Sequence, residues 1–232
     1  MDLFYFPALD LSVTTVTFSK EESKHISRVL RKQVGDQLRA TNGKGFEAIL
    51  ELIQVSNHHV LGKVNECIEH PPLPYKLHLA IAPTKNINRL EWFLEKATEI
   101  GIHKITPLAC EHSERRVIKT ERLEKIIIAA LKQSQQFYLP ELASLQSFNA
   151  FVATNPKGFI AHCQEGFKES FFNAVTPEGE VVLLIGPEGD FSMQEVEHAV
   201  AKGYIPVSLG NQRLRTETAA VVGCHTVALK AQ

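Results

Sequence analysis

Residues 184–192 read LIGPEGDFS and residues 208–219 read SLGNQRLRTETA, and these two stretches decide the fold of the chain. Each begins at the end of a short apolar run typical of a buried strand, passes through a turn that contains glycine, and leads into a helical pattern. Two such junctions place bare backbone and helix N-termini at one edge of a sheet. In open α/β folds that edge is where ligands bind.

Apolar runs alternate with helical patterns through the last two thirds of the chain. Helices are predicted at 89–100, from Thr120, from a Ser192/Glu195 capping box to Gly203, and at 219–229. Strands are predicted at 77–82, 102–108, 158–163, 181–185 and 204–209. This alternation predicts an α/β fold with a mostly parallel sheet covered by helices, and the wholly apolar 181–185 should be a central strand.

The first 70 residues have a different pattern, with short strands at 13–18, 37–41, 46–55 and 60–64. The sequence Asn42-Gly43-Lys44-Gly45 predicts a hairpin turn between two of these strands. One helix interrupts them, with Ser19 and Glu22 as a capping box and Ile26, Val29 and Leu30 as its apolar stripe. These features predict a small β-barrel. Prolines at 71, 72 and 74 indicate a linker, so we expect domains at 1–70 and 71–232.

Composition narrows the possible classes of function. The chain has 232 residues, of which 44% are hydrophobic and 22% charged, and its net charge of −1 excludes a large basic surface but not a local basic patch. The four cysteines are far apart, which argues against a zinc site and a disulfide framework. No metal-binding histidine spacing, signal-peptide pattern or membrane-length apolar run is present. We therefore expect no metal, no membrane association and a cytoplasmic location.

The first turn has neither GxGxxG nor GxxxxGK[ST], so it supports neither a dinucleotide nor a nucleoside triphosphate site. In the second turn, Leu214 stands between Arg213 and Arg215, and this alternation should turn Leu214 inward and the arginines toward a ligand or solvent. Thr216 is expected to cap the following helix, and Glu217 suits a helix N-terminus. Alternatively, Glu217 only pairs with a surface arginine.

Basic residues gather in two more places, at 25–32 and at 111–119. On one helix face or in one loop, such side chains could hold phosphates. A solvated helix face and a solvated loop are the alternatives.

Taken together, these segments resemble the RsmE family of SPOUT methyltransferases. The resemblance rests mainly on LIGPEG at 184–189 and LGxxxLRTETA at 209–219, in this order and spacing. HxxRVLR at 25–31, KATEIG at 96–101 and SER at 113–115 support it. The chain departs from the family pattern at two positions and in one segment: Asp190 replaces a glycine, Gln212 replaces an arginine, and residues 132–136 replace EQSxR.

The resemblance implies an N-terminal PUA-like β-barrel that binds RNA and a SPOUT α/β domain with a C-terminal trefoil knot. It also implies a homodimer with the active site at the subunit junction. The implied activity is methylation of N3 of a uridine in small-subunit (16S) ribosomal RNA, with S-adenosyl-L-methionine as the cofactor and no metal.

From the chemistry of the implied reaction, we expect specific roles for individual residues. Arg215 would stabilise the charge that develops on the uracil ring, and Glu217 would orient it or accept the proton, with Glu188 as an alternative. RNA phosphates would contact Arg28, Arg31, Arg115, Arg116, Lys119 and Arg213. The cofactor would be bound by Ile185, Gly186, Pro187, Glu188, Gly189, Ser208, Leu209, Gly210, Asn211, Leu214, Thr216 and Thr218.

Three other functions stay open. One is a SPOUT enzyme that methylates a ribose hydroxyl or another base nitrogen. Another is a catalytically silent RNA-binding protein. A third is a dinucleotide-dependent oxidoreductase, which the missing GxGxxG disfavours.

Overall fold

The computed structural model describes residues 2–166 and 168–232. The chain forms two compact units. The first extends to Pro72 and includes Leu131–Leu139, and the second comprises Leu73–Ala130 and Pro140–Gln232. The sequence places its single boundary after residue 70 and does not anticipate that a later segment returns to the first unit.

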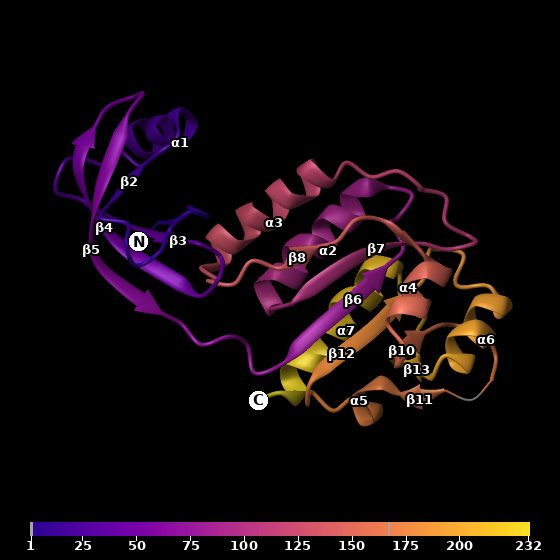
Figure 1. Ribbon diagram of the computed structural model, residues 1–232. Helices are drawn as coiled ribbons and strands as arrows, with labels where there is room; N and C mark the ends of the chain where they lie inside the picture. The colour runs from indigo at the N-terminus through magenta and orange to yellow at the C-terminus, as the bar shows by residue number, and fades with distance from the viewer. Residues whose placement is uncertain (1, 167) are drawn as a thin grey trace. The chain divides into compact units, whose positions relative to one another are not determined.

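The first unit is a curled five-stranded sheet in the order β1-β3-β4-β5-β2 (Figure 1). Its strands are β1 (Leu3–Tyr5), β2 (Thr15–Thr17), β3 (Gln37–Thr41), β4 (Phe46–Val55) and β5 (Val60–Glu69). The predicted hairpin between β3 and β4 is confirmed. Its turn is possible because Gly43 and Gly45 adopt positive φ angles of 72° and 91°, and Asn42 Oδ1 accepts hydrogen bonds from the backbone N–H groups of Lys44 and Phe46.

The helix of the first unit changes type along its length. Helix α1 (Lys20–Lys24) begins where predicted, since Ser19 Oγ accepts a hydrogen bond from Glu22 N at 3.2 Å. It continues as a π-helix, η1 (His25–Val29). The wider π turn shifts the faces of the helix, so Ile26 is fully buried but Val29 is 66% exposed. The prediction that Val29 belongs to the apolar stripe is therefore wrong.

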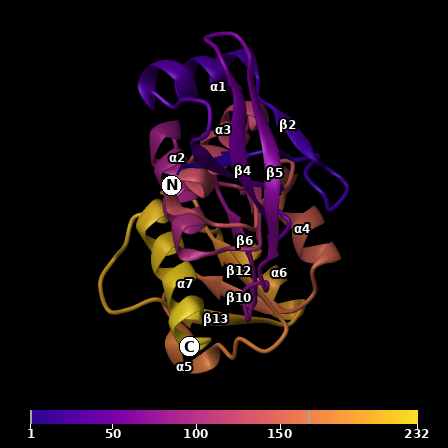
Figure 2. The ribbon, with the colours of Figure 1, turned by 90° about the vertical axis from the view of Figure 1, so that its left-hand side faces the viewer.

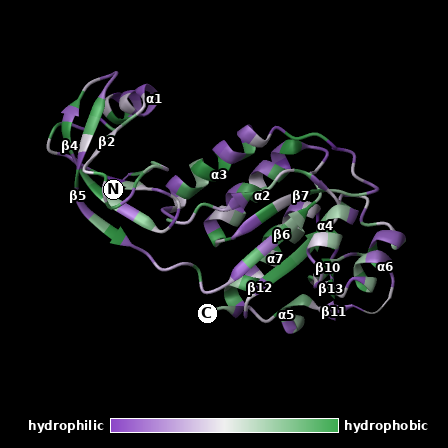
Figure 3. Cartoon of the chain, in the orientation of Figure 1, coloured by the Kyte–Doolittle hydropathy of each residue, from purple (hydrophilic) through white to green (hydrophobic). Residues whose placement is uncertain are grey.

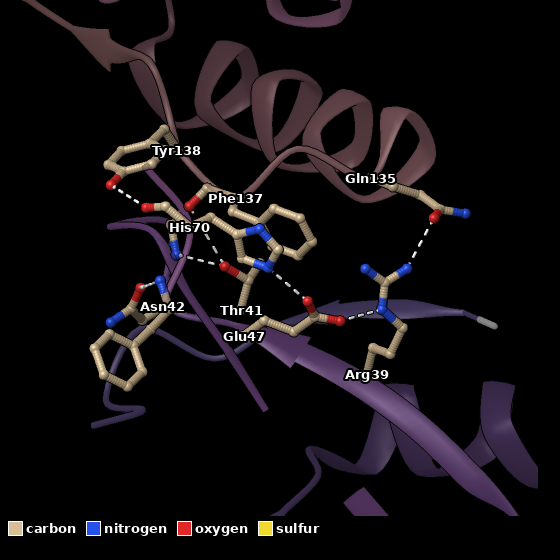
Figure 4. Close-up of polar contacts among 10 residues, drawn as sticks. Arg39, Thr41, Asn42, Glu47, His70, Gln135, Phe137 and Tyr138 are labelled. Atoms are coloured by element: carbon tan, nitrogen blue, oxygen red, sulfur yellow. Dashed lines mark hydrogen bonds and ion pairs between the residues drawn. The ribbon is translucent and has the colours of Figure 1, made fainter. Parts of the chain in front are cut away.

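The returning segment 131–139 is held to the sheet by the contacts drawn in Figure 4. The His70 ring stacks on Phe137 with 3.7 Å between centroids, and Tyr138 Oη donates to the His70 carbonyl at 2.8 Å. His70 Nε2 also lies 2.6 Å from Glu47 Oε2, while the other Glu47 oxygen accepts from Arg39 Nε. The buried carboxylate of Glu47 thus joins Arg39 on β3 to His70, the residue directly after β5.

Replacing Glu47 by Gln should lower the free energy of unfolding by about 2 kcal/mol near neutral pH, because two charge-assisted contacts of a buried carboxylate are lost. Hydrogen bonds from Arg39 and His70 outweigh burial and lower the pKa of Glu47 in the folded protein. A lowered folded pKa stabilises the protein above the unfolded value of 4.5, and this contribution disappears as the pH falls through the folded pKa.

Urea unfolding of wild type and Glu47→Gln from about pH 7 to about pH 3 measures this effect. The difference between the two proteins should be largest near neutral pH and should shrink as the medium becomes acidic. Glu66→Gln, at an exposed position of β5, is the matched control and should change stability by less than about 0.5 kcal/mol. A Glu47→Gln difference that grows in acid would contradict the assignment.

The second unit contains an eight-stranded sheet in which every pairing among the described strands is parallel, as predicted. Strand order is β11-β13-β10-β12-β6-β7-β8, with β9 paired to β7. β12 lies centrally, as expected, and is hydrophobic along most of its length (Figure 3). The strands are β6 (Lys76–Ile81), β7 (Lys104–Ala109), β8 (Glu141–Leu142), β9 (Gln146–Ser147), β10 (Gly158–Ala161), β11 (Glu169–Ser170), β12 (Glu180–Ile185) and β13 (Tyr204–Ser208).

Helices cover both faces of this sheet (Figure 2). α7 packs against α2, β6 and β12, while α4 and α6 cover the opposite face beside β7 and β13. The Ser192/Glu195 capping box of α6 is confirmed, whereas α4 and α5 are not predicted from the sequence. The helices are α2 (Ile87–Ile100), α3 (Thr120–Ser134, whose last residues belong to the first unit), α4 (Phe148–Thr154), α5 (Phe171–Ala174), α6 (Met193–Ala201) and α7 (Thr216–Lys230).

Candidate functional site

A cavity of about 700 Å³ opens at the carboxyl ends of three neighbouring strands, β10, β12 and β13. The last residues of the strands, Ala161, Ile185 and Val207, contribute apolar walls. The two glycine-containing turns that follow β12 and β13 form most of the remaining surface. The cavity therefore lies where the sequence predicts a ligand site, at the edge where parallel strands end.

Most of the residues predicted to bind the cofactor line this one cavity. They are Ile185, Gly186, Pro187, Glu188, Ser208, Leu209, Gly210, Asn211, Leu214 and Thr216. Gly189 and Thr218 are not among the lining residues. Cofactor binding by all of these residues stays a prediction.

Sequence reasoning missed four residues that line the same cavity at the end of β10 and in the loop beyond it: Ala161, His162, Cys163 and Lys168. Their segment carries no glycine motif, so no sequence motif marks it as part of a ligand site. A signal was nevertheless present, because 158–163 is predicted as a strand of the same parallel sheet. Its carboxyl end had to lie at the same edge as the two turns.

The glycines of the first turn are needed for packing within the protein. A Cβ atom on Gly186 would lie 3.0 Å from the Phe191 ring, and one on Gly189 would lie 3.1 Å from Cβ of His112. Gly210 is different, because its φ is +141° and a Cβ there would meet nothing within 4 Å. Only at Gly210, among these three, does the absent side chain leave open space.

The N-cap of helix α7 lies one residue before the predicted cap. Its N-cap is Arg215, which makes no side-chain capping bond, so the prediction that Thr216 caps the helix is wrong. Thr216 Oγ1 instead donates to the carbonyl of Gly186 at 3.1 Å. Its hydroxyl thereby ties the start of α7 to the first turn.

Asp190 ties the first turn to the loop that follows β10. It adopts a positive φ of 65°, and its carboxylate accepts hydrogen bonds from Cys163 N at 2.7 Å and Phe191 N at 2.8 Å. Asp190 stands where the resembling family has glycine, and the structure uses the added carboxylate for these two contacts. On the other side of the turn, Glu188 Oε1 accepts from Lys85 N at 3.0 Å.

The predicted alternation around Leu214 is confirmed, because Leu214 is half-buried while Arg213 and Arg215 are exposed. Both arginines line the cavity. Glu217 does not line it and is buried at 7% exposure, and its ion-pair partner is an arginine, as the alternative expects. Its Oε1 lies 3.8 Å from Arg89 Nε on α2, and its buried Oε2 has no partner among the described residues. Its catalytic role stays a prediction.

Two of the six predicted RNA-binding residues already donate side-chain hydrogen bonds to backbone carbonyls within the protein. Arg115 donates to the carbonyls of Thr84 and Lys85 at 3.1 and 2.7 Å. Arg116 donates to the carbonyls of Cys110 and Glu111. The side chains of Arg28 and Arg31 in the first unit, and of Lys119 and Arg213 in the second, are exposed. RNA contact by all six stays a prediction.

No group of His, Cys, Asp or Glu suited to hold a metal ion occurs among residues 2–166 and 168–232. In that same part of the chain, none of the helices combines the length and apolar character needed to cross a membrane.

Two family models match the chain, and the break between them lies close to the boundary of the two units after Pro72. The model described as an RNA methyltransferase PUA domain matches residues 18–65. The model described as an RNA methyltransferase domain matches residues 71–228.

Individual proteins are similar over almost the whole chain. The ribosomal RNA small subunit methyltransferase E of Bacillus subtilis is 31% identical, over 94% of this chain and 91% of its own. A crystal structure of a probable rRNA-methyltransferase from Porphyromonas gingivalis has a TM-score of 0.91 and 38% identity, covering 99% and 98% of the two chains. The Neisseria gonorrhoeae ribosomal RNA small subunit methyltransferase E, crystallised with S-adenosyl methionine, has a TM-score of 0.86 and 26% identity, covering 97% and 95%.

Proposed function

Because the chain belongs to the ribosomal RNA small subunit methyltransferase E family, we propose that it methylates N3 of a uridine in small-subunit (16S) ribosomal RNA, with S-adenosylmethionine as methyl donor. One observation carries this proposal. The two motif-bearing turns, together with the end of β10, enclose a single cavity of about 700 Å³ at the carboxyl edge of the parallel sheet. A related protein was crystallised with S-adenosyl methionine.

The residues of this cavity fit the proposed cofactor. Apolar side chains at the strand ends suit a flat purine, and the open space beside Gly210 allows a ligand to approach the backbone. His162 also lines the cavity, and its two buried ring nitrogens have no partner among the described residues. When bound, the cofactor supplies a methyl group on a positively charged sulfur, which needs no metal.

The chain's own residues would orient the acceptor base and stabilise its charge. Arg215 is exposed at the cavity, so its guanidinium is available to the carbonyl oxygens that flank N3 of uracil as the proton leaves. Arg28 and Arg31 of the first unit, with Lys119 and Arg213 of the second, would contact phosphates, which position RNA without reading its sequence.

The proposal is tested by mapping the methylated atom. Small-subunit ribosomal RNA from cells that lack this protein should miss one N3-methyluridine that wild-type cells contain, and a plasmid copy of the chain should restore it. Loss of a ribose methyl or of another base methyl would instead identify a different SPOUT activity. An unchanged set of methylated nucleotides would contradict the enzyme proposal altogether.

We expect S-adenosylmethionine and its demethylated product to bind with one molecule per chain and without a metal. The cavity provides backbone, apolar and imidazole groups, and no metal-binding group of side chains occurs in the described part of the chain. Isothermal titration calorimetry with and without a chelator measures this. A stoichiometry or affinity that depends on a divalent ion would contradict the site.

We also propose that the protein is a homodimer whose active site is completed at the subunit junction. The surface of α7 supports this, because Val221 and Val222 are only half-buried and Leu229 is 48% exposed. Light scattering at the concentrations used for activity should give twice the monomer mass, and dilution below the dissociation constant should reduce activity. A fully active monomer would contradict this proposal but leave the cofactor site unaffected.

Two further parts of the proposal concern the chain path and the location. We propose that the segment leading to α7 threads through a loop to form a trefoil knot, which the bond from Thr216 to Gly186 supports by joining the two turns. An experimental structure with continuous density through 186–216 would test the threading. A cytoplasmic location follows from the proposed ribosomal RNA substrate, and cell fractionation would check it.

A further inference from the structure

His162 occupies a central position in the cavity, although the family motifs do not include it. It directly follows Ala161, the last residue of β10, and β10 lies between the two strands that carry the motif-bearing turns. His162 is one of the residues that line the cavity. Any ligand that contacts both turns therefore passes the end of β10.

The hydrogen-bonding groups of His162 are buried but unused. Nδ1 and Nε2 are each almost completely shielded from solvent, and neither has a partner among the described residues. An unsatisfied buried polar atom destabilises the folded protein, so such atoms call for an explanation. At a cavity wall, the direct explanation is a ligand that supplies the missing partner.

The protonation state of His162 limits which partners are suitable. Burial lowers the pKa of the imidazole, and the positive charge of Lys168 lowers it further, while Asp190 acts in the opposite direction. The ring is therefore neutral near neutral pH, with one N–H donor and one acceptor nitrogen. A neutral ring suits a neutral, polar ligand edge better than a fully charged group.

The surroundings of His162 indicate which part of the cofactor lies there. Ala161 is in register with Ile185 on one side and with Val207 on the other, so three adjacent strand ends form an apolar floor. The arginines at 213 and 215 are instead on the second turn. A flat purine with a polar edge matches the floor and the imidazole, whereas the charged amino-acid end matches neither.

Asp190 holds the backbone next to His162 in place. Its carboxylate bonds the N–H of Cys163, the residue directly after His162, and the N–H of Phe191 in the first turn. Gln164 Nε2 adds a bond to the carbonyl of Phe191 at 2.9 Å. The loop that carries the imidazole is thus fastened to the first turn at two successive residues.

We propose that the imidazole of His162 hydrogen-bonds the adenosyl part of the bound cofactor, and that Asp190 is the positioning residue that holds it there. This inference rests on the proposed function, because it takes S-adenosylmethionine as the occupant of the cavity. Asp190 acts through the loop backbone and does not itself contact the cofactor.

Calorimetry with two ligands tests the contact. S-adenosylhomocysteine contains the whole demethylated cofactor, and 5′-methylthioadenosine keeps the adenosyl part but lacks the amino-acid end. His162→Ala should weaken both about fivefold to tenfold, the effect of one neutral hydrogen bond, whereas Asn or Gln at this position, whichever matches the nitrogen used, should restore most of the affinity. His198→Ala, at an exposed position of α6 outside the cavity lining, should change neither affinity.

A double-mutant cycle tests the positioning role. Asp190→Gly removes the carboxylate while placing at φ 65° the residue that best tolerates this conformation. It should weaken 5′-methylthioadenosine binding about as much as His162→Ala, and the double variant should lose little more than either single variant. Independent, additive losses would overturn the positioning role, because a purely structural effect of Asp190 would not depend on His162.

Thermal unfolding should first show that the variants are folded. Each of the remaining binding results then overturns a specific proposal. Unchanged affinity of His162→Ala for both ligands would overturn the inference alone. Weaker binding of S-adenosylhomocysteine with unchanged binding of 5′-methylthioadenosine would overturn it too, since the contact would then be to the amino-acid end. Wild-type protein that bound neither ligand would overturn the proposed function and this inference together.

Discussion

Replacing Arg215 by alanine should lower the rate of methyl transfer by roughly a hundredfold or more, the usual cost of removing one donor that stabilises developing charge. Arg215 is the N-cap of α7 and lines the cavity. Its backbone is fixed because the neighbouring Thr216 bonds the carbonyl of Gly186. A guanidinium that extends from this anchored position can meet charge on uracil without first reorganising the turn.

Single-turnover rates at saturating RNA and saturating cofactor measure this effect, with cofactor affinity determined separately by calorimetry. The affinity should stay nearly unchanged, because the proposed contact of Arg215 is to the acceptor base. A wild-type rate for Arg215→Ala would show that its assigned role is wrong. Loss of cofactor binding would instead assign Arg215 a structural role in shaping the turn.

Arg213→Ala is the matched control for this experiment, since both arginines are exposed and line the same cavity. Arg213 lies two residues farther from the start of α7 and should mainly contact RNA phosphate. Its replacement should weaken RNA binding and reduce the dependence of affinity on salt, while the single-turnover rate at saturating RNA stays close to that of wild type. A salt series of RNA affinities distinguishes the two arginines.

Replacing Phe191 by alanine should lower the free energy of unfolding by about 3–5 kcal/mol, as expected for removing a large buried ring. Phe191 is completely buried and packs near Phe148, with 5.6 Å between ring centroids. Its ring also fills the space beside Gly186, where a Cβ atom would come within 3.0 Å of it. The variant should therefore also bind S-adenosylhomocysteine more weakly, because the first turn loses its packing support.

Urea unfolding and calorimetry measure the two effects. Phe172→Ala is the matched control: its ring is 54% exposed and contacts Lys230, with Nζ 4.9 Å from the ring centroid. This control should lose no more than about 1 kcal/mol of stability. Equal losses in the two variants would contradict the idea that the Phe191 ring supports the turn from within the core.

The sequence by itself determined the succession of elements in the second unit. Local hydrophobic periodicity reports how each segment is buried, and β6, β7, β10, β12 and β13 all appear where apolar runs predict them. It also determined where a ligand site must lie, because strands of a parallel sheet all end at the same edge. The position of the cavity can therefore be predicted from the two motif-bearing turns alone, without knowledge of any long-range contact.

Tertiary structure alone decided which side chains serve the site and which serve the protein itself. Val29 is exposed because a π turn changes the helical period, and Thr216 bonds the carbonyl of Gly186 instead of capping its own helix. His162 and Glu217 illustrate the same limit. His162 lines the cavity although it belongs to no motif, whereas Glu217 belongs to a motif but contacts Arg89 of α2. Periodicity describes burial along one segment, whereas these roles depend on contacts between residues far apart in the chain, which no local pattern contains.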